Sequence, residues 1–529
     1  MQLTPSSLNK KEKHFLKTTQ LNNLVKAEKM PPRKLRRKTR EPKLHKLADK
    51  LTEILIYFMV IFSPWAFGTT EPWSIWTMNI SAYALGILLV TKWITRLATK
   101  YNPNPGLEKN ELSPKQNRLR LIQKTCTILL ACSMFLLLAY ILTSAINARA
   151  SFNFDTKEYT YFEGVNKNLP HSYDARGTWF LLWQYLGLII LFWSTRDWFT
   201  EAKLTKHSTS INPRLKRLLL LLCFNGGALA LECMLQRIYF GDFRGKLLFL
   251  IEPSINSSNI AQFGPFAYRS NAASYLNLIW PIGLGLLIQM GRKNLEYGKK
   301  RIGNGPELLL IPCIILAASG PIISSARGGA LVMISLLVLA SVSLIFMNLR
   351  SLFLRFSISM ALIIGLGLAC YLGWEKIEPR LINIFTDNMS SRTQLYETTL
   401  KMINDYGKFG SGPGSFEAII QFEMGGILSR WESWAHNDYL EFYLTFGKAG
   451  GAMMFFILLS LTARTTLSLF LKPQKIVTWF VLMPLVGVGI HAAGDFPLQT
   501  LSILIPVCIL LSFLTVTPKY ERNATSALV

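Results

Sequence analysis

The feature that most constrains this chain is the recurrence of apolar runs long enough to cross a membrane. A bilayer core requires roughly 20 apolar residues in helical form. Runs of this kind begin near Leu51, Trp73, Leu121, Thr178, Leu215, Asn271, Glu307, Gly329, Phe356, Phe446, Lys475 and Leu498. With 50% hydrophobic and 17% charged residues, the chain is too apolar for an ordinary soluble enzyme. We therefore predict an all-α polytopic integral membrane protein with about twelve transmembrane helices.

The positions of the basic residues predict how these helices are oriented. Lys and Arg collect in residues 92–124, 196–217, 292–301, 350–355 and 464–475, and these segments alternate with less basic ones. Because basic loops favour the cytoplasmic side, both termini are expected in the cytoplasm. The net charge is +26, but the basic residues lie between apolar runs and do not interleave with aromatic residues. This placement argues against a nucleic-acid partner.

This orientation predicts the domain organisation. Residues 1–50, with eleven Lys and four Arg against four acidic residues, are expected to form a disordered cytoplasmic tail near anionic lipid. Residues 51–372 would hold the first nine helices, 373–445 a large extracytoplasmic loop, 446–517 the last three helices and 518–529 a second cytoplasmic tail. Within the loop, helical spacing is expected over residues 393–406 and 431–446, on either side of an irregular glycine-rich turn at 410–414.

Several common kinds of site are not predicted. The seven cysteines lie in or beside apolar runs, without a CxxC pair or a cysteine–histidine cluster, so neither a disulfide framework nor a zinc site is expected. The chain has no Asp-x-Asp motif, Walker loop or dinucleotide fingerprint, so nucleotide sugars, ATP and NAD lack their usual binding devices and no cofactor is expected. An enzyme of this kind needs an already activated lipid donor.

The histidines differ in predicted position. His14, His45 and His207 fall in segments expected to be cytoplasmic and solvated, whereas His171, His436 and His491 fall near the outer face. His436 is predicted on an amphipathic helix before a span, where its neutral imidazole would accept a proton from a sugar hydroxyl or position that hydroxyl. The alternative is a hydrogen-bonded structural histidine.

Three arginines are candidates for binding phosphate. Arg327 lies between two apolar runs with almost no loop, and an arginine there is costly unless it has a partner or a function. Its planar guanidinium suits phosphate oxygens; the alternative is an arginine that reaches lipid headgroups. Arg269 precedes another span on the same side, and the two together would hold a diphosphate. Arg392 opens the large loop and would add a third positive charge, or would simply be solvated.

His491 and Asp495 are four residues apart at the outer end of a span. This spacing places them on one face of a helix. They are expected to pair with each other or with one of the arginines, and a purely structural pair is the alternative.

Together these segments resemble the O-antigen ligase and O-antigen polymerase superfamily of bacterial envelope glycosyltransferases, over residues 263–498. The matched segments are Gly264-Pro265-Phe266-Ala267-Tyr268-Arg269-Ser270-Asn271, Ser325-Ala326-Arg327-Gly328-Gly329, Arg392 with the turn Gly410-Ser411-Gly412-Pro413-Gly414, and His436-Asn437-Asp438-Tyr439-Leu440-Glu441. Tyr268, Ser270 and Asn271 depart from the Asn, Asn and His of the family pattern, so in that first segment Arg269 alone is carried over as a functional position.

The resemblance implies a helical membrane fold of the lipid-dependent glycosyltransferase type, GT-C-like, in the bacterial inner membrane. It implies a polyprenyl-diphosphate-linked glycan as donor, a glycolipid such as lipid A core or a growing polysaccharide as acceptor, inversion at the anomeric carbon and no metal. It also implies catalytic roles for Arg327 and His436. We expect the substrate-binding residues to be Arg269, Arg392, Asn437, His491 and Asp495.

Alternatives to a ligase remain open at this level. The same family pattern fits a polysaccharide polymerase or a protein O-oligosaccharyltransferase. From other classes, about twelve spans would also suit a transporter or flippase for a lipid-linked glycan, or a scaffold for polysaccharide assembly. A transporter should carry its critical polar residues near the middle of the membrane, whereas those identified here map to one outer rim.

Overall fold

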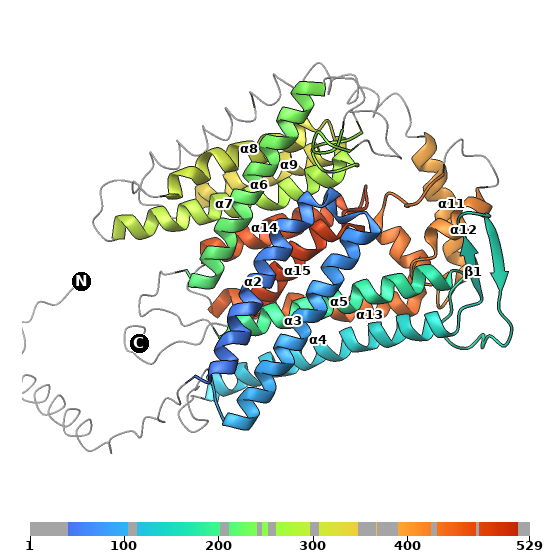
Figure 1. The fold of residues 1–529 in the computed structure, drawn as a ribbon, viewed down its shortest axis with the longest axis horizontal. Helices are drawn as coiled ribbons and strands as arrows, with labels where there is room; N and C mark the ends of the chain where they lie inside the picture. The colour runs from blue at the N-terminus through green and yellow to red at the C-terminus, as the bar shows by residue number, and fades with distance from the viewer. Residues whose placement is uncertain are drawn as a thin grey trace, which may run out of the picture.

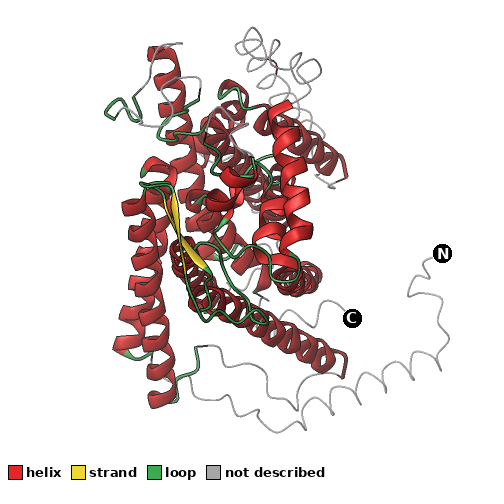
Figure 2. Ribbon diagram, turned by 90° about the vertical axis from the view of Figure 1, so that its right-hand side faces the viewer, coloured by secondary structure: helices red, strands yellow, loops and turns green. Residues whose placement is uncertain are grey.

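The computed structural model describes residues 41–103, 114–201, 211–240, 246–251, 261–296, 306–346, 367, 390–424, 431–471 and 475–516. These residues are almost entirely helical (Figure 1 and Figure 2). The strands among them form one antiparallel pair, β1 (Ala150–Asn153) and β2 (Glu158–Tyr161), with Ser151 opposite Thr160. His14, His207, most of the predicted tails and the predicted span near Phe356 lie outside the described residues.

The helices follow the apolar runs of the sequence. The first half of the chain contains α2 (Lys43–Trp65), η1 (Phe67–Thr69), α3 (Pro72–Thr99), α4 (Pro114–Ile146), α5 (Ala175–Thr200) and α6 (Pro213–Phe240). The second half contains α7 (Arg269–Glu296), η3 (Pro306–Leu309), α8 (Leu310–Ile323), α9 (Arg327–Phe346), α11 (Ser390–Tyr406), α12 (Phe416–Glu423), α13 (Asp438–Leu471), α14 (Lys475–His491), η4 (Pro497–Gln499) and α15 (Leu501–Thr515).

Seven of the described helices are long and apolar enough to cross a membrane: α3, α4, α5, α6, α7, α9 and α13. The helices α8, α14 and α15 are apolar but shorter. This pattern is consistent with a polytopic membrane protein, while the total of about twelve spans stays a prediction. Helix α2 begins at Lys43, so the first helix extends into residues that were expected to belong to a disordered tail.

Helix α7 forms the centre of the bundle and carries part of the candidate site at its start. It packs against α6, α8, α9 and α14. Of its most apolar 18-residue stretch, 94% is buried, compared with 28% for the corresponding stretch of α4. Because it has almost no surface facing lipid, it can hold polar side chains that neighbouring helices satisfy. Asn277, for example, donates from Nδ2 to the carbonyl of Gly329 on α9 at 2.8 Å.

A small unit of short helices and strands gathers at one end of the bundle. Helices α11 and α12 and the β1–β2 pair lie together beyond the ends of α4, α5 and α13, at the right of Figure 1. The glycine-rich turn at 410–414 joins α11 and α12 and packs on the start of α5 and on α13. Gly410 has a φ of +70°, and a Cβ there would come within 2.4 Å of the Leu444 carbonyl, so this contact requires glycine.

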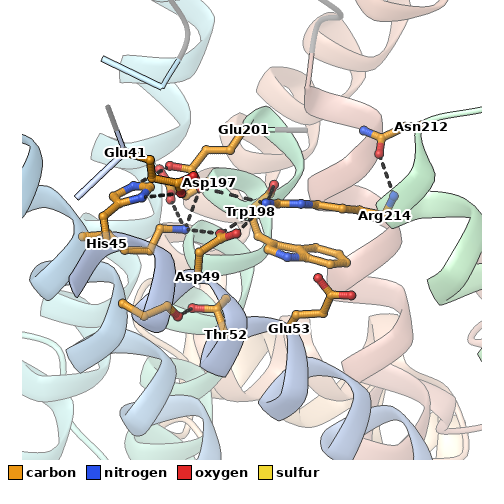
Figure 3. Close-up of polar contacts among 12 residues, drawn as sticks. Glu41, His45, Asp49, Thr52, Glu53, Asp197, Trp198, Glu201, Asn212 and Arg214 are labelled. Atoms are coloured by element: carbon orange, nitrogen blue, oxygen red, sulfur yellow. Dashed lines mark hydrogen bonds and ion pairs between the residues drawn. The ribbon is translucent and has the colours of Figure 1, made fainter. Parts of the chain in front are cut away.

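At the other end of the bundle, a cluster of charged side chains connects α2, α3, α5 and α6 (Figure 3). Nζ of Lys92, on α3, lies 3.1 Å from Asp49, 2.8 Å from Asp197 and 3.2 Å from Glu201. Arg96 and Arg214 complete the cluster through ion pairs to Asp197, Glu201 and Asp49. Buried acids and bases therefore neutralise each other where α2, α3, α5 and α6 meet.

His45 belongs to this cluster, which corrects its predicted exposure to solvent. It is buried, and its Nε2 lies 3.0 Å from Glu201 while its Nδ1 lies 3.2 Å from Glu41. The cause is the early start of α2, which places His45 against α5 instead of in a free tail.

A second correction concerns the helix predicted over residues 431–446. Residues 431–437 have no regular secondary structure, and α13 begins only at Asp438. By contrast, the predicted helix at 393–406 is contained in α11, with Leu395, Thr399 and Met402 buried on one face.

Candidate functional site

Five segments of the chain bring the predicted site residues to one end of the bundle. They are the start of α7, the short α8–α9 connection, the start of α11, the residues before α13, and the turn that joins α14 to η4. Hydrogen bonds and close contacts link these segments in a continuous series. The residues that the sequence analysis selected are therefore neighbours in space, although they are spread from Arg269 to Asp495.

Asp495 is the centre of this arrangement. Its Oδ1 accepts from the backbone N–H of Phe496 at 3.1 Å and lies 3.2 Å from Nδ1 of His436. Its Oδ2 accepts from the Tyr268 hydroxyl at 3.2 Å and from the hydroxyl of Ser270. With both oxygens occupied by protein groups, this carboxylate orients its neighbours instead of contacting a ligand directly.

The pKa of Asp495 reflects these partners. Burial alone would raise it, but hydrogen bonds from His436 and Ser270 and the nearby imidazoles hold the pKa of Asp495 below its usual range. The pKa of the Tyr268 hydroxyl is raised, first by burial and then by the adjacent Asp495 charge. The pair is thus a carboxylate facing a neutral phenol that donates to it.

His436 lies just before α13, not on the predicted helix. Its backbone adopts a φ of +52°, in the left-handed region, and its carbonyl accepts from the hydroxyl of Tyr396 on α11 at 2.8 Å. Since Nδ1 faces Asp495, Nε2 points away from the carboxylate, and it has no hydrogen-bond partner among the described residues. A carboxylate at Nδ1 favours the tautomer with the proton on that nitrogen, which leaves Nε2 as an acceptor.

The start of α13 fixes His436 against the turn that carries Asp495. Asn437 caps the helix, because its Oδ1 accepts from the N–H groups of Tyr439 and Leu440, both at 3.1 Å. The N–H of Asp438 donates to the carbonyls of Ala492 at 2.9 Å and Asp495 at 3.3 Å. The expected substrate-binding residue Asn437 therefore has a capping oxygen that is already in use, and its role in binding substrate stays a prediction.

His491 is the last residue of α14, and Asp495 lies beyond the end of that helix. The expectation that the two share one helical face is therefore wrong, because the chain turns at residues 492–495. They are linked instead through Ser270, whose hydroxyl lies 3.1 Å from His491 Nε2 and donates to Asp495. Nδ1 of His491 is buried and has no hydrogen-bond partner in the described ranges of the chain.

Arg327 begins α9 and is half-buried. Within the described part of the chain, its guanidinium has no hydrogen bond, ion pair or ring contact. The next residue, Gly328, lies against His491, since a Cβ at Gly328 would be 3.2 Å from Nε2. An arginine that has no partner among the described residues is therefore the chain neighbour of a glycine that lies against His491.

The other two arginines surround the same series. Arg269 begins α7, one helical turn before Ala273, which is the residue that Gly329 of α9 contacts. Arg392 donates from Nη1 to the carbonyl of Gly494 at 2.9 Å. Arg269, Arg327 and Arg392 thus lie in the first turns of three different helices, α7, α9 and α11.

Four aromatic and hydroxyl residues of the site were not selected from the sequence. Tyr268 and Ser270 depart from the family pattern, yet both donate to Asp495. Phe496 stacks on Tyr268 with ring centroids 5.0 Å apart and on Trp434 at 5.3 Å. Their proximity in sequence to Arg269, Asp495 and His436 was the available signal, but none of the four carries a charge that would single it out.

The fold and the site define a polytopic membrane protein with a histidine, a carboxylate and several arginines at one end of its helical bundle. The family model described as O-antigen ligase matches residues 312–455 of the chain. The matched segment contains Arg327, Arg392 and His436, whereas Arg269, His491 and Asp495 lie outside it and join the site through the fold. Neither a curated protein nor a solved structure matches the chain.

Proposed function

We propose that this protein is a ligase-type glycosyltransferase that moves a glycan from a polyprenyl-diphosphate carrier to an acceptor hydroxyl at the site around His436 and Arg327. The family supports a ligase or polymerase type of function in general. The observation that carries the specific proposal is the pairing of His436 Nδ1 with Asp495 at 3.2 Å, at the end of the bundle where Arg327 has no partner among the described residues.

His436 serves as the general base in this proposal. Asp495 holds the proton on Nδ1 and stabilises the imidazolium that forms when Nε2 takes the proton of the acceptor hydroxyl. The side chain of His436 is 15% exposed and that of Asp495 is 7% exposed. The base can thus meet a substrate while the residue that orients it stays enclosed.

The arginines bind the leaving group. Arg327 and Arg269 hold the diphosphate oxygens, and Arg392 adds positive charge at the edge of the site. As the bond from the anomeric carbon to the diphosphate breaks, negative charge builds on the leaving polyprenyl diphosphate, and guanidinium groups in a poorly hydrated site stabilise that charge strongly. These cations supply the charge stabilisation that a metal ion gives in other transferases, so the proposed reaction needs no metal.

The reaction balances as a single displacement. The acceptor oxygen bonds to the anomeric carbon from the face opposite the diphosphate, its proton passes to His436 Nε2, and polyprenyl diphosphate leaves as an anion. In-line attack inverts the anomeric configuration. Because diphosphate is already a good leaving group, phosphate binding contributes at least as much as the base.

The membrane context belongs to the same proposal. In this proposal the chain is a multi-pass protein of the bacterial inner membrane, with about twelve spans, a GT-C-like arrangement, both termini in the cytoplasm and the site on the periplasmic face. Residues 373–445 would then form the large periplasmic loop between helices in residues 51–372 and 446–517. The acceptor we favour is lipid A core.

The direct test is glycan transfer by purified protein in lipid nanodiscs. The assay supplies a polyprenyl-diphosphate oligosaccharide with lipid A core as acceptor, and compares wild type with His436→Ala and Arg327→Ala. We expect transfer by wild type in the presence of a chelator, and loss of at least roughly 100-fold in each variant.

Two controls separate chemistry from folding. His171→Gln changes a histidine whose Nδ1 contacts the Leu169 carbonyl, and Arg176→Ala changes an exposed arginine at the start of α5. Both should retain transfer. Wild-type turnover by a well-folded Arg327→Ala protein would reject the proposal, and so would an absence of transfer by wild type with lipid A core and with polysaccharide acceptors.

A further inference from the structure

Trp434 is an exposed tryptophan two residues before His436. Its side chain is 36% exposed, although it lies in a segment where Glu432 and Ala435 are buried. Within the described part of the chain, its indole N–H has no hydrogen-bond partner. A large aromatic side chain close in sequence to the reacting histidine therefore keeps apolar surface exposed and has a hydrogen-bond donor that no described residue uses.

The ring is held in place from one side. Tyr268, Phe496 and Trp434 form a stack of three nearly parallel rings, with interplanar angles of 13° and 18°. Tyr268 is anchored by its hydrogen bond to Asp495, and the edge of the His436 ring contacts Phe496 at 5.1 Å between centroids. Trp434 is the outer end of this stack, since Phe496 is its one ring neighbour among the described residues.

Such a surface suits a sugar ring. A pyranose presents a patch of C–H bonds on one face and hydroxyl groups around its edge, so it matches an aromatic face that has a polar donor at its rim. Because Phe496 already supports the indole from behind, little side-chain freedom is lost when a ring binds.

The order of contacts assigns this surface to the acceptor. From Arg327, the series runs through Gly328, His491, Ser270 and Asp495 to His436, and from there through Phe496 to Trp434. Arg327 and Trp434 therefore stand at opposite ends of the series. In the proposed function, on which this inference rests, the donor phosphates bind at Arg327 and at Arg269, the neighbour of Ser270, and the acceptor hydroxyl meets His436.

We infer that Trp434 forms a stacking subsite for the pyranose ring of the acceptor that carries, or adjoins, the attacking hydroxyl. The subsite positions the acceptor and contributes to its selection. Donor binding does not depend on it.

The chain offers a matched control in Trp431. It is 39% exposed and only three residues away, but Phe152 stacks on it at 6.3 Å, Lys157 Nζ lies over the ring at 5.6 Å, and its N–H donates to Glu417 at 2.8 Å. Its ring thus contacts an aromatic and a cationic side chain and its donor is bonded within the protein, so a change at Trp431 should leave acceptor binding intact.

The experiment compares Trp434→Phe, Trp434→Leu and Trp431→Leu in the nanodisc assay, with lipid A core varied at fixed donor and the donor varied at fixed lipid A core. Trp434→Leu should raise the acceptor KM about tenfold, with the donor KM within about twofold of wild type. Trp434→Phe keeps an aromatic face and should stay near wild type. Trp431→Leu should match wild type.

A binding measurement separates this inference from the proposed function. Saturation-transfer NMR detects binding of the core oligosaccharide, freed of its lipid chains, without any turnover. Binding that is lost in Trp434→Leu but kept in Trp434→Phe and Trp431→Leu would support the subsite even if wild type transferred no glycan. An unchanged acceptor KM in Trp434→Leu, an equal loss in Trp431→Leu, or a rise in the donor KM instead would overturn it.

Discussion

His436 and Asp495 are separated by 59 positions in the sequence, yet Nδ1 of the imidazole lies 3.2 Å from Oδ1 of the carboxylate. The contact depends on two backbone connections, from the N–H of Asp438 to the carbonyls of Ala492 and Asp495. These connections join the start of α13 to the turn after α14. The histidine is therefore oriented by the packing of two helix ends, and not by the local structure of its own segment.

The first prediction concerns Asp495→Asn. The amide cannot stabilise an imidazolium and allows the wrong histidine tautomer, so we expect kcat to fall by roughly 100-fold or more while the donor KM changes little. Initial rates at saturating donor test this. Asp155→Asn, which alters an acidic residue of the exposed β1–β2 connection, is the matched control, and an equal effect in both variants would show that Asp495 has no special role.

The second prediction concerns the charge at Arg327. Arg327→Lys keeps a positive charge but loses the planar pair of donors, so it should retain part of the activity, while Arg327→Ala should lose roughly 100- to 1,000-fold in kcat/KM for the donor. Donor titrations measure the difference. If Lys and Ala were equally active, the guanidinium would not be binding phosphate.

The third prediction concerns pH and stability. The pKa of Asp495 in the folded protein is held below its usual value, which in an unfolded chain is about 3.9. Its charge therefore stabilises the folded state above that pH, and this contribution is lost as the pH falls through the lower, folded pKa. Thermal unfolding is measured from about pH 6 to about pH 3, on either side of the pKa of the unfolded chain. The Tm of wild type should exceed that of Asp495→Asn by the largest margin near the higher pH. A constant difference would contradict the linkage.

The fourth prediction concerns the charged cluster at the opposite end of the bundle. The side chain of Lys92 is 1% exposed and faces Asp49, Asp197 and Glu201. Lys92→Met leaves those carboxylates buried without their central cation and should destabilise the protein by about 3–5 kcal/mol, with kcat unchanged in the folded fraction. Denaturant or thermal unfolding in detergent measures the loss.

The control for that variant is Arg217→Met. Arg217 pairs with Glu53 at 2.7 Å, but its side chain is 52% exposed, so removal of this pair should cost less than about 1 kcal/mol. Equal destabilisation by the two substitutions would mean that burial of the cluster is not the source of its contribution.

Much of the architecture followed from the amino-acid pattern alone. Long apolar runs can satisfy their backbone hydrogen bonds in lipid only as helices, so the positions of most helices were predictable. Arg327 was identifiable for a related reason, because a charge between two apolar runs with almost no loop is costly without a function. The match of residues 312–455 to the O-antigen ligase family model agrees with the resemblance seen in those segments.

Two of the errors arose where a capping residue or a turn overrode helical spacing. Residues 431–446 have helical periodicity, but the side chain of Asn437 accepts from the first N–H groups of α13 and starts that helix there. His491 and Asp495 have the spacing of helical neighbours, but α14 ends at His491. Periodicity reports which residues share a face only while the helix continues.

The sequence by itself determined the helical membrane class, the candidate charged residues and the chemistry that each could perform. Tertiary structure alone decided which groups meet. Ser270 and Asp495 are 225 positions apart, and the support of Trp434 by Phe496 joins two segments that have no common local pattern. Such contacts depend on how α7, α13 and α14 pack together, and packing is a property of whole helix surfaces that no single segment of sequence records.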